Sequence, residues 1–203
     1  MPASQYVIAL NGIQKGLTGY LQPLGFKKDG RTYNRRVGDG LIQTVNLQMG
    51  QKGLHGRFTI NFGVALPAVR PIEFGREFPE FIQEYDCEIR ARLFHLIFHK
   101  DTWLDLDHQL EKTAADTIRY MDAAGLTFLE EFESYEAILA IIDSRGCLPS
   151  SNKGRSALIG AIVCVHLKQP DRARAYFDRA AELAGRNRGF GYHVAQLRRA
   201  CGL

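Results

Sequence analysis

Two segments in the first third of the chain alternate apolar and polar side chains with a period of two. They are LIQTVNLQM (41–49) and RFTINFGVAL (57–66), and a short link with three glycines joins them. A period of two is typical of a strand with one buried face, and glycines between two such strands indicate a turn. The pattern therefore predicts an antiparallel hairpin, so the fold must contain a sheet.

The register of this hairpin follows from the requirement that its apolar side chains share one face. Pairing Leu47 with Ile60 satisfies the requirement, and a shift by one residue would move a whole strand's side chains to the wrong face. The other face is then polar. Its predicted cross-strand neighbours are Asn46 with Asn61 and Gln48 with Thr59.

Neighbouring segments extend the hairpin into an α+β domain. A stripe of Leu10, Ile13, Leu17 and Leu21 predicts a helix that ends before Pro23. RTYNRRV (31–37) and CEIRARL (87–93) are further candidate strands, and the proline-containing residues 67–86 predict an irregular loop with a short helical turn. Over residues 1–105 we therefore expect one helix on an antiparallel sheet of about four strands.

From residue 106 onward the apolar spacing is helical. We expect an all-α region over residues 106–203, with helical hairpins at 106–143 and 155–185 and a final short helix at 190–200. Gly125 is expected to separate the first two helices, because Thr127 and Glu130 after it form the pattern of a capping box.

Composition and charge narrow the functional classes. The chain has 203 residues, of which 45% are apolar and 24% charged, as in ordinary soluble domains. No apolar run approaches the roughly 18 residues of a membrane span, and the N-terminus lacks the pattern of a secretory signal. Four scattered cysteines predict free thiols in the cytoplasm.

The charge is divided unevenly along the second half of the chain. Residues 106–152 carry three basic and nine acidic side chains, whereas residues 153–203 carry ten basic and three acidic ones. Either the two segments attract each other as neighbouring helices, which we favour, or the basic segment faces an anionic partner.

The polar face of the predicted sheet is the best candidate for a binding site. If CEIRARL joins the sheet, its two arginines project onto the face that carries the amides and hydroxyls, and these donors suit a carboxylate, a phosphate or an acidic protein. Alternatively, Glu88 and nearby acids pair with the arginines, or the helical region covers the face. The predicted binding residues are Arg90, Arg92, Asn46, Gln48, Thr59 and Asn61.

Two other clusters favour structural roles. We expect a solvated edge of the fold at the basic residues Lys27, Lys28, Arg31, Arg35 and Arg36. The pair His95 and His99 has the i, i+4 spacing of metal ligands, with Asp101, Asp105 and His108 downstream. No glutamate lies between the two histidines, which favours a structural role over a metal site.

Known catalytic and nucleic-acid motifs give no further support. The first five residues of RGFGYHVA (188–195) fit an RNA-recognition signature, but that signature belongs on a central strand and the flanking segments are helical. We therefore expect a turn before the final helix there. No phosphate-binding loop or nucleophile elbow occurs, so we predict no catalytic residue, metal or cofactor.

Five motifs in the first half occur in a recognisable order, namely Gly25-Phe26, Tyr33 with Arg35, LIQTVNLQ (41–48), FTINFG (58–63) and CEIRARL (87–93). With them, residues about 6–105 resemble the bacterial domain-of-unknown-function family 4304. The resemblance implies a helix against an antiparallel sheet and supplies no activity. Relatives near contact-dependent toxin systems add, by analogy, the implication of an immunity-like role.

Residues about 155–185 resemble a single tetratricopeptide-like helical hairpin. Gly185 stands where that repeat usually has a proline. The residues that carry the resemblance are Ala161, Cys164, Ala173, Phe177 and Ala180.

Together these observations predict a non-enzymatic, cytoplasmic bacterial protein that binds a protein partner through the polar sheet face or a helical groove. The alternative is an enzyme or binder that acts on an anionic small molecule or nucleic acid through Arg90 and Arg92. Nucleic-acid binding through residues 153–203 is the least favoured reading, and no membrane partner is expected.

Overall fold

The computed structural model describes residues 3–106 and 110–203. Contacts between Cα atoms divide the chain into two compact units. The first unit comprises Met1–Arg36, Ile42–Ala65 and Phe81–Glu130, and the second comprises Val37–Leu41, Leu66–Glu80 and Glu131–Leu203. These units divide the chain differently from the expected domains 1–105 and 106–203, and the domain boundary at residue 105 stays a prediction.

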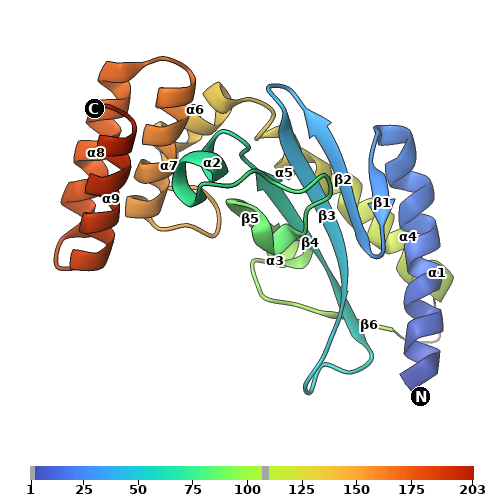
Figure 1. The fold of residues 1–203 in the computed structure, drawn as a ribbon. Helices are drawn as coiled ribbons and strands as arrows, with labels where there is room; N and C mark the ends of the chain where they lie inside the picture. Colours follow the sequence, from blue (N-terminus) through green and yellow to red (C-terminus); the bar gives the residue numbers. More distant parts are fainter. Residues whose placement is uncertain (1–2, 107–109) are drawn as a thin grey trace. The chain divides into compact units, whose positions relative to one another are not determined.

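The first unit is built around an antiparallel sheet with the strand order β1-β2-β3-β4-β5, and β6 also pairs with β4 (Figure 1). Its strands are β1 (Lys27–Asp29), β2 (Thr32–Val37), β3 (Leu41–Met49), β4 (Arg57–Ala65), β5 (Ile89–Arg92) and β6 (Leu104–Asp105). The four strands predicted from the sequence are β2 to β5. The two additional strands have three and two residues, too few to show an alternating pattern.

The predicted hairpin register is confirmed. In the β3–β4 pair Leu47 lies opposite Ile60, Asn46 opposite Asn61, and Gln48 opposite Thr59. The apolar side chains at positions 45, 47, 60 and 62 are at most 1% exposed. Burial of one complete face therefore determines the register, as expected for a period of two.

Helices cover the apolar side of the sheet in the first unit. They are α1 (Ala3–Leu21), α4 (Leu110–Tyr120), the π-helical turn η3 (Met121–Gly125) and α5 (Leu126–Glu130). Helix α1 packs on α4, and Figure 1 shows the two helices side by side. The two helices face each other at Gly16, where an added Cβ would lie at an ordinary contact distance of 3.8 Å from Ile118. The Thr18 hydroxyl on α1 hydrogen-bonds to the Tyr33 hydroxyl on β2 over 2.7 Å, which ties helix to sheet.

The expected helix break at Gly125 is wrong. Helix α5 follows η3 without a turn, so Thr127 lies inside a helix and the expected capping box does not form. Gly125 is needed for packing instead, since an added Cβ would stand 2.5 Å from the Phe62 ring. The chain leaves the helix after Glu130, and the next helix is capped by Ser134, whose Oγ accepts the Ala137 N–H over 3.1 Å.

The second unit consists mainly of helices. They are α2 (Val69–Phe74), α6 (Tyr135–Arg145), α7 (Lys153–His166), α8 (Pro170–Ala184) and α9 (Arg188–Ala200). Helix α7 contacts α2, α6 and α8, and residues 156–164 of α7 are completely buried. A helix that is buried all round is the centre of its core. Helix α9 packs on α8 and α2 and starts two residues before the expected position 190.

Two short helical segments lie within the region where the sequence indicated a loop with a helical turn. They are α2 and the 3-10 turn η2 (Glu84–Asp86). No helix of the described residues is long and apolar enough to cross a membrane. All four cysteines are free.

Candidate functional site

The polar face of the sheet continues across β2 to β5. Thr32 and Asn34 extend it onto β2, where they bond to the side chains of Asn46 and Thr44 on β3. On β4 and β5, Asn61 lies opposite Arg92 and Gly63 opposite Arg90. All six residues predicted for the site therefore belong to one face, as the alternation required.

Part of this face is covered by residues 82–87 of the first unit itself. The Asn34 side chain donates to the Ile82 carbonyl over 3.1 Å and accepts the Ile82 N–H over 2.8 Å. The Thr32 hydroxyl donates to the Gln83 side chain over 2.6 Å. We call residues 82–87 the cover segment. Because its backbone is paired with a sheet side chain, the polar residues beneath it are structural.

The cover segment ends in a close contact between Cys87 and the sheet. An added Cβ at Gly63 would lie 2.5 Å from the Cys87 sulfur, and this sulfur lies 3.7 Å from the Thr44 hydroxyl. Burial raises the pKa of the Cys87 thiol, more than the Thr44 hydrogen bond lowers it. The thiol is thus protonated at neutral pH and is a poor nucleophile.

Outside the cover segment, a chain of hydrogen bonds crosses four strands, from β5 to β2. Arg92 donates to the Asn61 oxygen over 3.2 Å, and the Asn61 amide donates to Gln48 over 2.8 Å and weakly to Asn46 over 3.4 Å. Asn46 donates in turn to Thr32 over 2.9 Å. These side chains orient one another, so their positions are fixed before any partner arrives.

Arg92 is held on a second side as well. Its guanidinium bonds to the Asp101 carboxylate and stands over the Trp103 ring, 5.1 Å from the ring centroid. The Arg92 side chain is 30% exposed and that of Asp101 68%. The guanidinium is therefore anchored without being buried, which is the state of an arginine ready to receive another hydrogen-bond acceptor.

The rest of the open area mixes charge with aromatic surface. Arg90 and Gln48 are exposed, Asn46 and Trp103 are half-buried, and Tyr85 on the cover segment is 67% exposed. We call Asn46, Gln48, Arg90, Arg92 and Trp103 the open strip.

Glu84 of the cover segment responds electrostatically to the open strip. Burial raises the pKa of the Glu84 carboxyl. Hydrogen bonds from the backbone of Glu84 and Tyr85, and after them the positive charges of Arg90 and Arg92, partly offset this effect. The alternative that nearby acids pair with the arginines thus holds for Asp101, which pairs with Arg92. Both arginines also interact electrostatically with Glu84.

The remaining predicted residues of the face are not accessible. Thr59 is completely buried and its hydroxyl has no hydrogen-bond partner in the described part of the chain. Asn61 is only 6% exposed and serves the hydrogen-bond chain. Thr59 and Asn61 therefore support the site from within the sheet, and a partner would contact the other four predicted residues.

The basic cluster near β1 divides into two kinds of residue. Lys27 and Lys28 are exposed on the short edge strand β1. Arg35 instead donates to Gln43 over 2.7 Å and stands over the Phe26 ring. Gln43 is completely buried and donates to the Leu129 carbonyl over 2.7 Å, so Arg35 stabilises the fold.

The histidine pair does not form a metal cluster with the described residues. Helix α3 (Leu93–Phe98) includes His95 but ends before His99, which adopts a left-handed conformation with φ of +53°. Both side chains are exposed, and no group of three His, Cys, Asp or Glu residues suited to a metal occurs in the described ranges. His108 lies outside the described residues.

The RGFGYHVA segment forms the start of α9 and not a strand. Asn187 caps this helix by accepting the Phe190 N–H over 3.0 Å. The aromatic residues of the segment are consequently not placed on a sheet as in an RNA-recognition domain.

A buried ion pair in the second unit was not anticipated from the sequence. The Glu73 side chain on α2 is only 4% exposed, and both its oxygens bond to the Arg155 guanidinium on α7, the longer contact being 2.6 Å. His193 on α9 lies 3.3 Å from the same carboxylate. Glu73 therefore joins three helices, and only the tertiary structure brings these residues together.

Comparison with known proteins assigns the first half of the chain. The family described as Domain of unknown function (DUF4304) matches residues 17–131. No curated protein and no solved structure matches the chain. Nothing in these comparisons supports the tetratricopeptide resemblance, although α7 and α8 do form a packed pair. The match covers more than half of the residues of the chain, and the chain therefore belongs to the domain-of-unknown-function family DUF4304.

Proposed function

We propose that this protein is a non-enzymatic binding module of the cytoplasm whose open strip docks a protein partner. The observation that carries the proposal is the orientation of Arg92. Arg92 is oriented by Asn61, Asp101 and Trp103, yet nearly a third of its side chain stays exposed. A pre-oriented arginine loses little conformational entropy on binding, which favours affinity.

The composition of the strip supports a protein partner. Arginine, tryptophan and tyrosine are the residue types enriched among binding hot spots. Arg90, Arg92 and Trp103 supply two of these types, and Tyr85 of the cover segment is exposed as well. Amide side chains at Asn46 and Gln48 add hydrogen-bonding groups at the rim. The surface is open at Arg90 and Gln48, which suits a macromolecule better than an enclosed small substrate.

The thiol chemistry of the first unit is consistent with a binding role. Cys87 is the cysteine next to the strip, and burial raises its pKa. A nucleophilic mechanism at this face would need the opposite shift.

The test is a tagged capture from the native host with two pairs of substitutions. Arg90→Ala/Arg92→Ala removes both guanidinium groups, and Lys27→Ala/Lys28→Ala removes two exposed charges from β1 as the matched control. Circular dichroism and thermal melting establish that each variant is folded. A captured protein is then purified and its direct binding is measured by calorimetry.

We expect the arginine pair to weaken direct binding by about thirtyfold or more, because truncation of even one hot-spot residue costs about 2 kcal/mol or more. The lysine pair should leave binding almost unchanged. The proposal fails if both variants bind equally well. It also fails if the strip retains only nucleic acid or a small molecule, which would support the alternative role at Arg90 and Arg92.

An immunity-like role is a narrower form of the same proposal, in which the partner is a toxin. It predicts that the captured protein carries a toxic activity and that the open strip is needed to suppress it. A harmless partner would exclude this narrower role and leave the binding role intact.

A further inference from the structure

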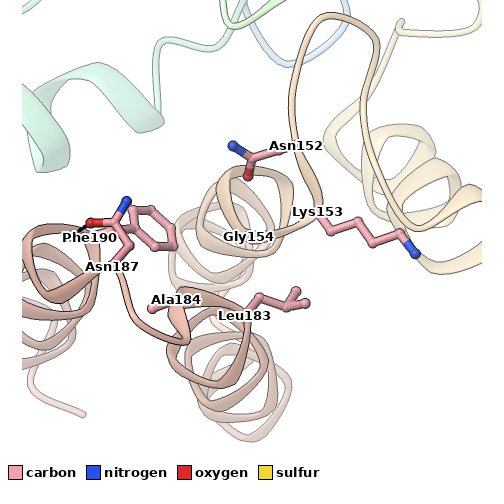
Figure 2. A pocket seen from close by; sticks show the side chains of 7 residues that line it. All are labelled: Asn152, Lys153, Gly154, Leu183, Ala184, Asn187 and Phe190. Carbon is pink, nitrogen blue, oxygen red and sulfur yellow. Dashed lines mark hydrogen bonds between the residues drawn. The ribbon is translucent and has the colours of Figure 1, made fainter.

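The second unit contains a cleft whose polar groups are already in use. Its volume is about 300 Å³, and it lies where α7 and α9 begin and α8 ends. A Cβ added at Gly154 would lie 3.1 Å from the Phe190 ring, so no partner side chain fits between them. Figure 2 shows that the Lys153 side chain points away from Phe190 and Asn187. The side-chain oxygens of Asn152 and Asn187 each accept an N–H of the first turn of their own helix.

Arg92 on the open strip, in contrast, still has unused hydrogen-bond donors. Its Nε donates to Asn61 and its Nη1 to Asp101, whereas Nη2 forms no hydrogen bond to a described residue. An arginine binds a carboxylate best through two N–H groups at once. Since the sheet holds Nε, the two nitrogens that a partner can reach together are Nη1 and Nη2. A two-oxygen acceptor therefore competes with Asp101 for Nη1.

The contact between Arg92 and Asp101 is of a kind that a partner can replace. Asp101 lies in the irregular segment between α3 and β6, and its side chain is 68% exposed. Among the described residues, Arg92 is the partner of its carboxylate, and exposed ion pairs contribute little to stability. Asn61 and Trp103 hold the guanidinium from two other directions. Arg92 therefore keeps its orientation when Asp101 leaves.

A second unused donor lies on the other side of the Asn61 side chain. The Gln48 side-chain oxygen accepts the Asn61 amide over 2.8 Å. The NH2 group of Gln48 donates to none of the described residues, and this side chain is exposed. Arg92 and Gln48 thus bond to the same amide, one at its oxygen and one at its nitrogen, and both present N–H groups to a partner.

The charges around the strip favour a carboxylate over a phosphate. Glu84 interacts electrostatically with both arginines of the strip. Two further acids lie close to Glu84, because all three act on the Cys87 thiol; they are Asp86 and Glu88. Exchange of Asp101 for another carboxylate leaves the local charge unchanged. A phosphate group carries about −1.5 to −2 charges, so it would add repulsion from these acids.

We propose that the open strip binds an aspartate or glutamate side chain of the partner protein, and that this carboxylate takes the place of Asp101 on Arg92. The incoming carboxylate binds Nη1 and Nη2 together, and Asp101 turns into the solvent. The Gln48 NH2 group donates to a backbone carbonyl next to the acidic residue. This inference rests on the proposed function of the open strip. It adds the chemical class of the recognised group and an internal competitor for it.

The experiment uses the full chain and defined peptide probes. A peptide array holds the central residue at glutamate, aspartate, glutamine or phosphoserine and varies the flanking residues. The best acidic peptide is labelled with fluorescein, and its dissociation constant is measured by anisotropy. Asp101→Asn removes the internal competitor. Asp105→Asn is the matched control, because the Asp105 side chain is 70% exposed and pairs with Arg57, much as that of Asp101 is 68% exposed and pairs with Arg92.

We expect the array to favour glutamate or aspartate over glutamine and phosphoserine. Asp101→Asn should tighten binding by about three- to fivefold, because the peptide no longer has to displace an exposed ion pair. Asp105→Asn should change binding by no more than about 1.5-fold, since solvent and salt screen its charge. In a chain that also carries Arg92→Gln, Asp101→Asn should no longer tighten binding. Circular dichroism verifies that each variant is folded.

Several results would overturn the inference. If Asp101→Asn weakens binding or leaves it unchanged, Asp101 orients Arg92 or does not compete. A preference for phosphoserine, or the absence of any selected acidic peptide, excludes the carboxylate. In these cases the proposed function of the open strip is still decided by its own capture experiment. An acidic peptide that binds Arg90→Ala/Arg92→Ala as tightly as the wild type would instead count against the open strip itself, and so against both proposals.

Discussion

Gly63 of β4 lies directly beneath Cys87 of the cover segment, so closely that a Cβ added at Gly63 would stand 2.5 Å from the sulfur. A glycine is required here by close approach, since the cover segment could not otherwise lie against the sheet. The contact makes residues 82–87 part of the first unit's core. The cover segment also determines which part of the polar face is left for a partner.

Substitution Gly63→Ala should displace the cover segment. We expect a loss of about 1–3 kcal/mol in the free energy of unfolding, typical of overpacked cores, measured by urea denaturation. The Cys87 thiol should also react faster with a thiol reagent such as DTNB. Gly12→Ala is the control, because Gly12 is an exposed helical residue with free space around it. It should stabilise the chain by up to about 1 kcal/mol, and equal effects of the two substitutions would contradict the close contact.

Asn34→Ala should release the cover segment at its other end. The substitution removes both bonds to Ile82 and leaves its N–H and carbonyl without their partner. We expect a loss of about 1–3 kcal/mol and faster amide hydrogen exchange in a peptide that spans residues 82–87. Asn11→Ala, at an exposed position of α1, should stay within about 0.5 kcal/mol of the wild type. Unchanged exchange at Ile82 would mean that Asn34 does not hold this segment.

Glu84→Gln should stabilise the protein at neutral pH. The folded-state pKa of Glu84 is raised by burial, so the charged form is less favourable in the folded chain than in the unfolded one. By linkage, Glu84 makes its full contribution to the free energy of unfolding at a pH below the pKa that it has in the unfolded chain. This contribution is lost as the pH rises through the pKa of Glu84 in the folded chain.

The neutral glutamine avoids this loss. The variant should therefore unfold at a higher urea concentration than the wild type at about pH 7, and the difference should vanish at about pH 3, where the glutamate is protonated. The exposed glutamate at position 80 supplies the control Glu80→Gln. A variant less stable than the wild type at neutral pH would show that the backbone hydrogen bonds and the charges of Arg90 and Arg92 together outweigh the burial of Glu84.

Arg155→Met should strongly destabilise the second unit. The substitution leaves the Glu73 carboxylate, which is 4% exposed, without the guanidinium that binds both its oxygens. Loss of one member of a buried ion pair costs about 3–5 kcal/mol. Because Arg155 is 28% exposed, we expect about 2–3 kcal/mol. The double substitution Glu73→Leu/Arg155→Met should recover part of this loss.

The matched control for Arg155→Met is Arg174→Met. Arg174 pairs with Asp171, but the Asp171 side chain is 97% exposed, so solvent screens the pair. Its loss should cost no more than about 1 kcal/mol. If both arginine substitutions have the same effect on chemical denaturation, Glu73 is not an anchor for its three helices.

The elements that could be predicted from the sequence are those specified by local periodicity. The alternation in 41–49 and 58–66 set the β3–β4 register, and the same argument placed Arg90 and Arg92 on the polar face. Thr32 and Asn34 alternate with Tyr33 and Arg35 in the same way. That signal was sufficient to extend the polar face onto β2.

Gly125 illustrates why the same reasoning failed elsewhere. Glycine commonly ends a helix, and the capping pattern after it strengthened that expectation. The structure uses the missing side chain to admit the Phe62 ring from the sheet. The sequence around Gly125 does not show whether the glycine serves packing or a turn. What decides this is the Phe62 ring, which belongs to a residue more than sixty positions away.

By itself, the sequence determined the α+β class, the register of the β3–β4 hairpin and which side chains share the polar face, because these follow from periods of two and 3.6 along the backbone. Only the tertiary structure decided which of those side chains a partner could reach. Residues 82–87 cover one part of the face, while Asp101 and Trp103 hold Arg92 in the open part. These contacts join segments that no repeating sequence pattern relates, so they depend on the tertiary packing of the chain.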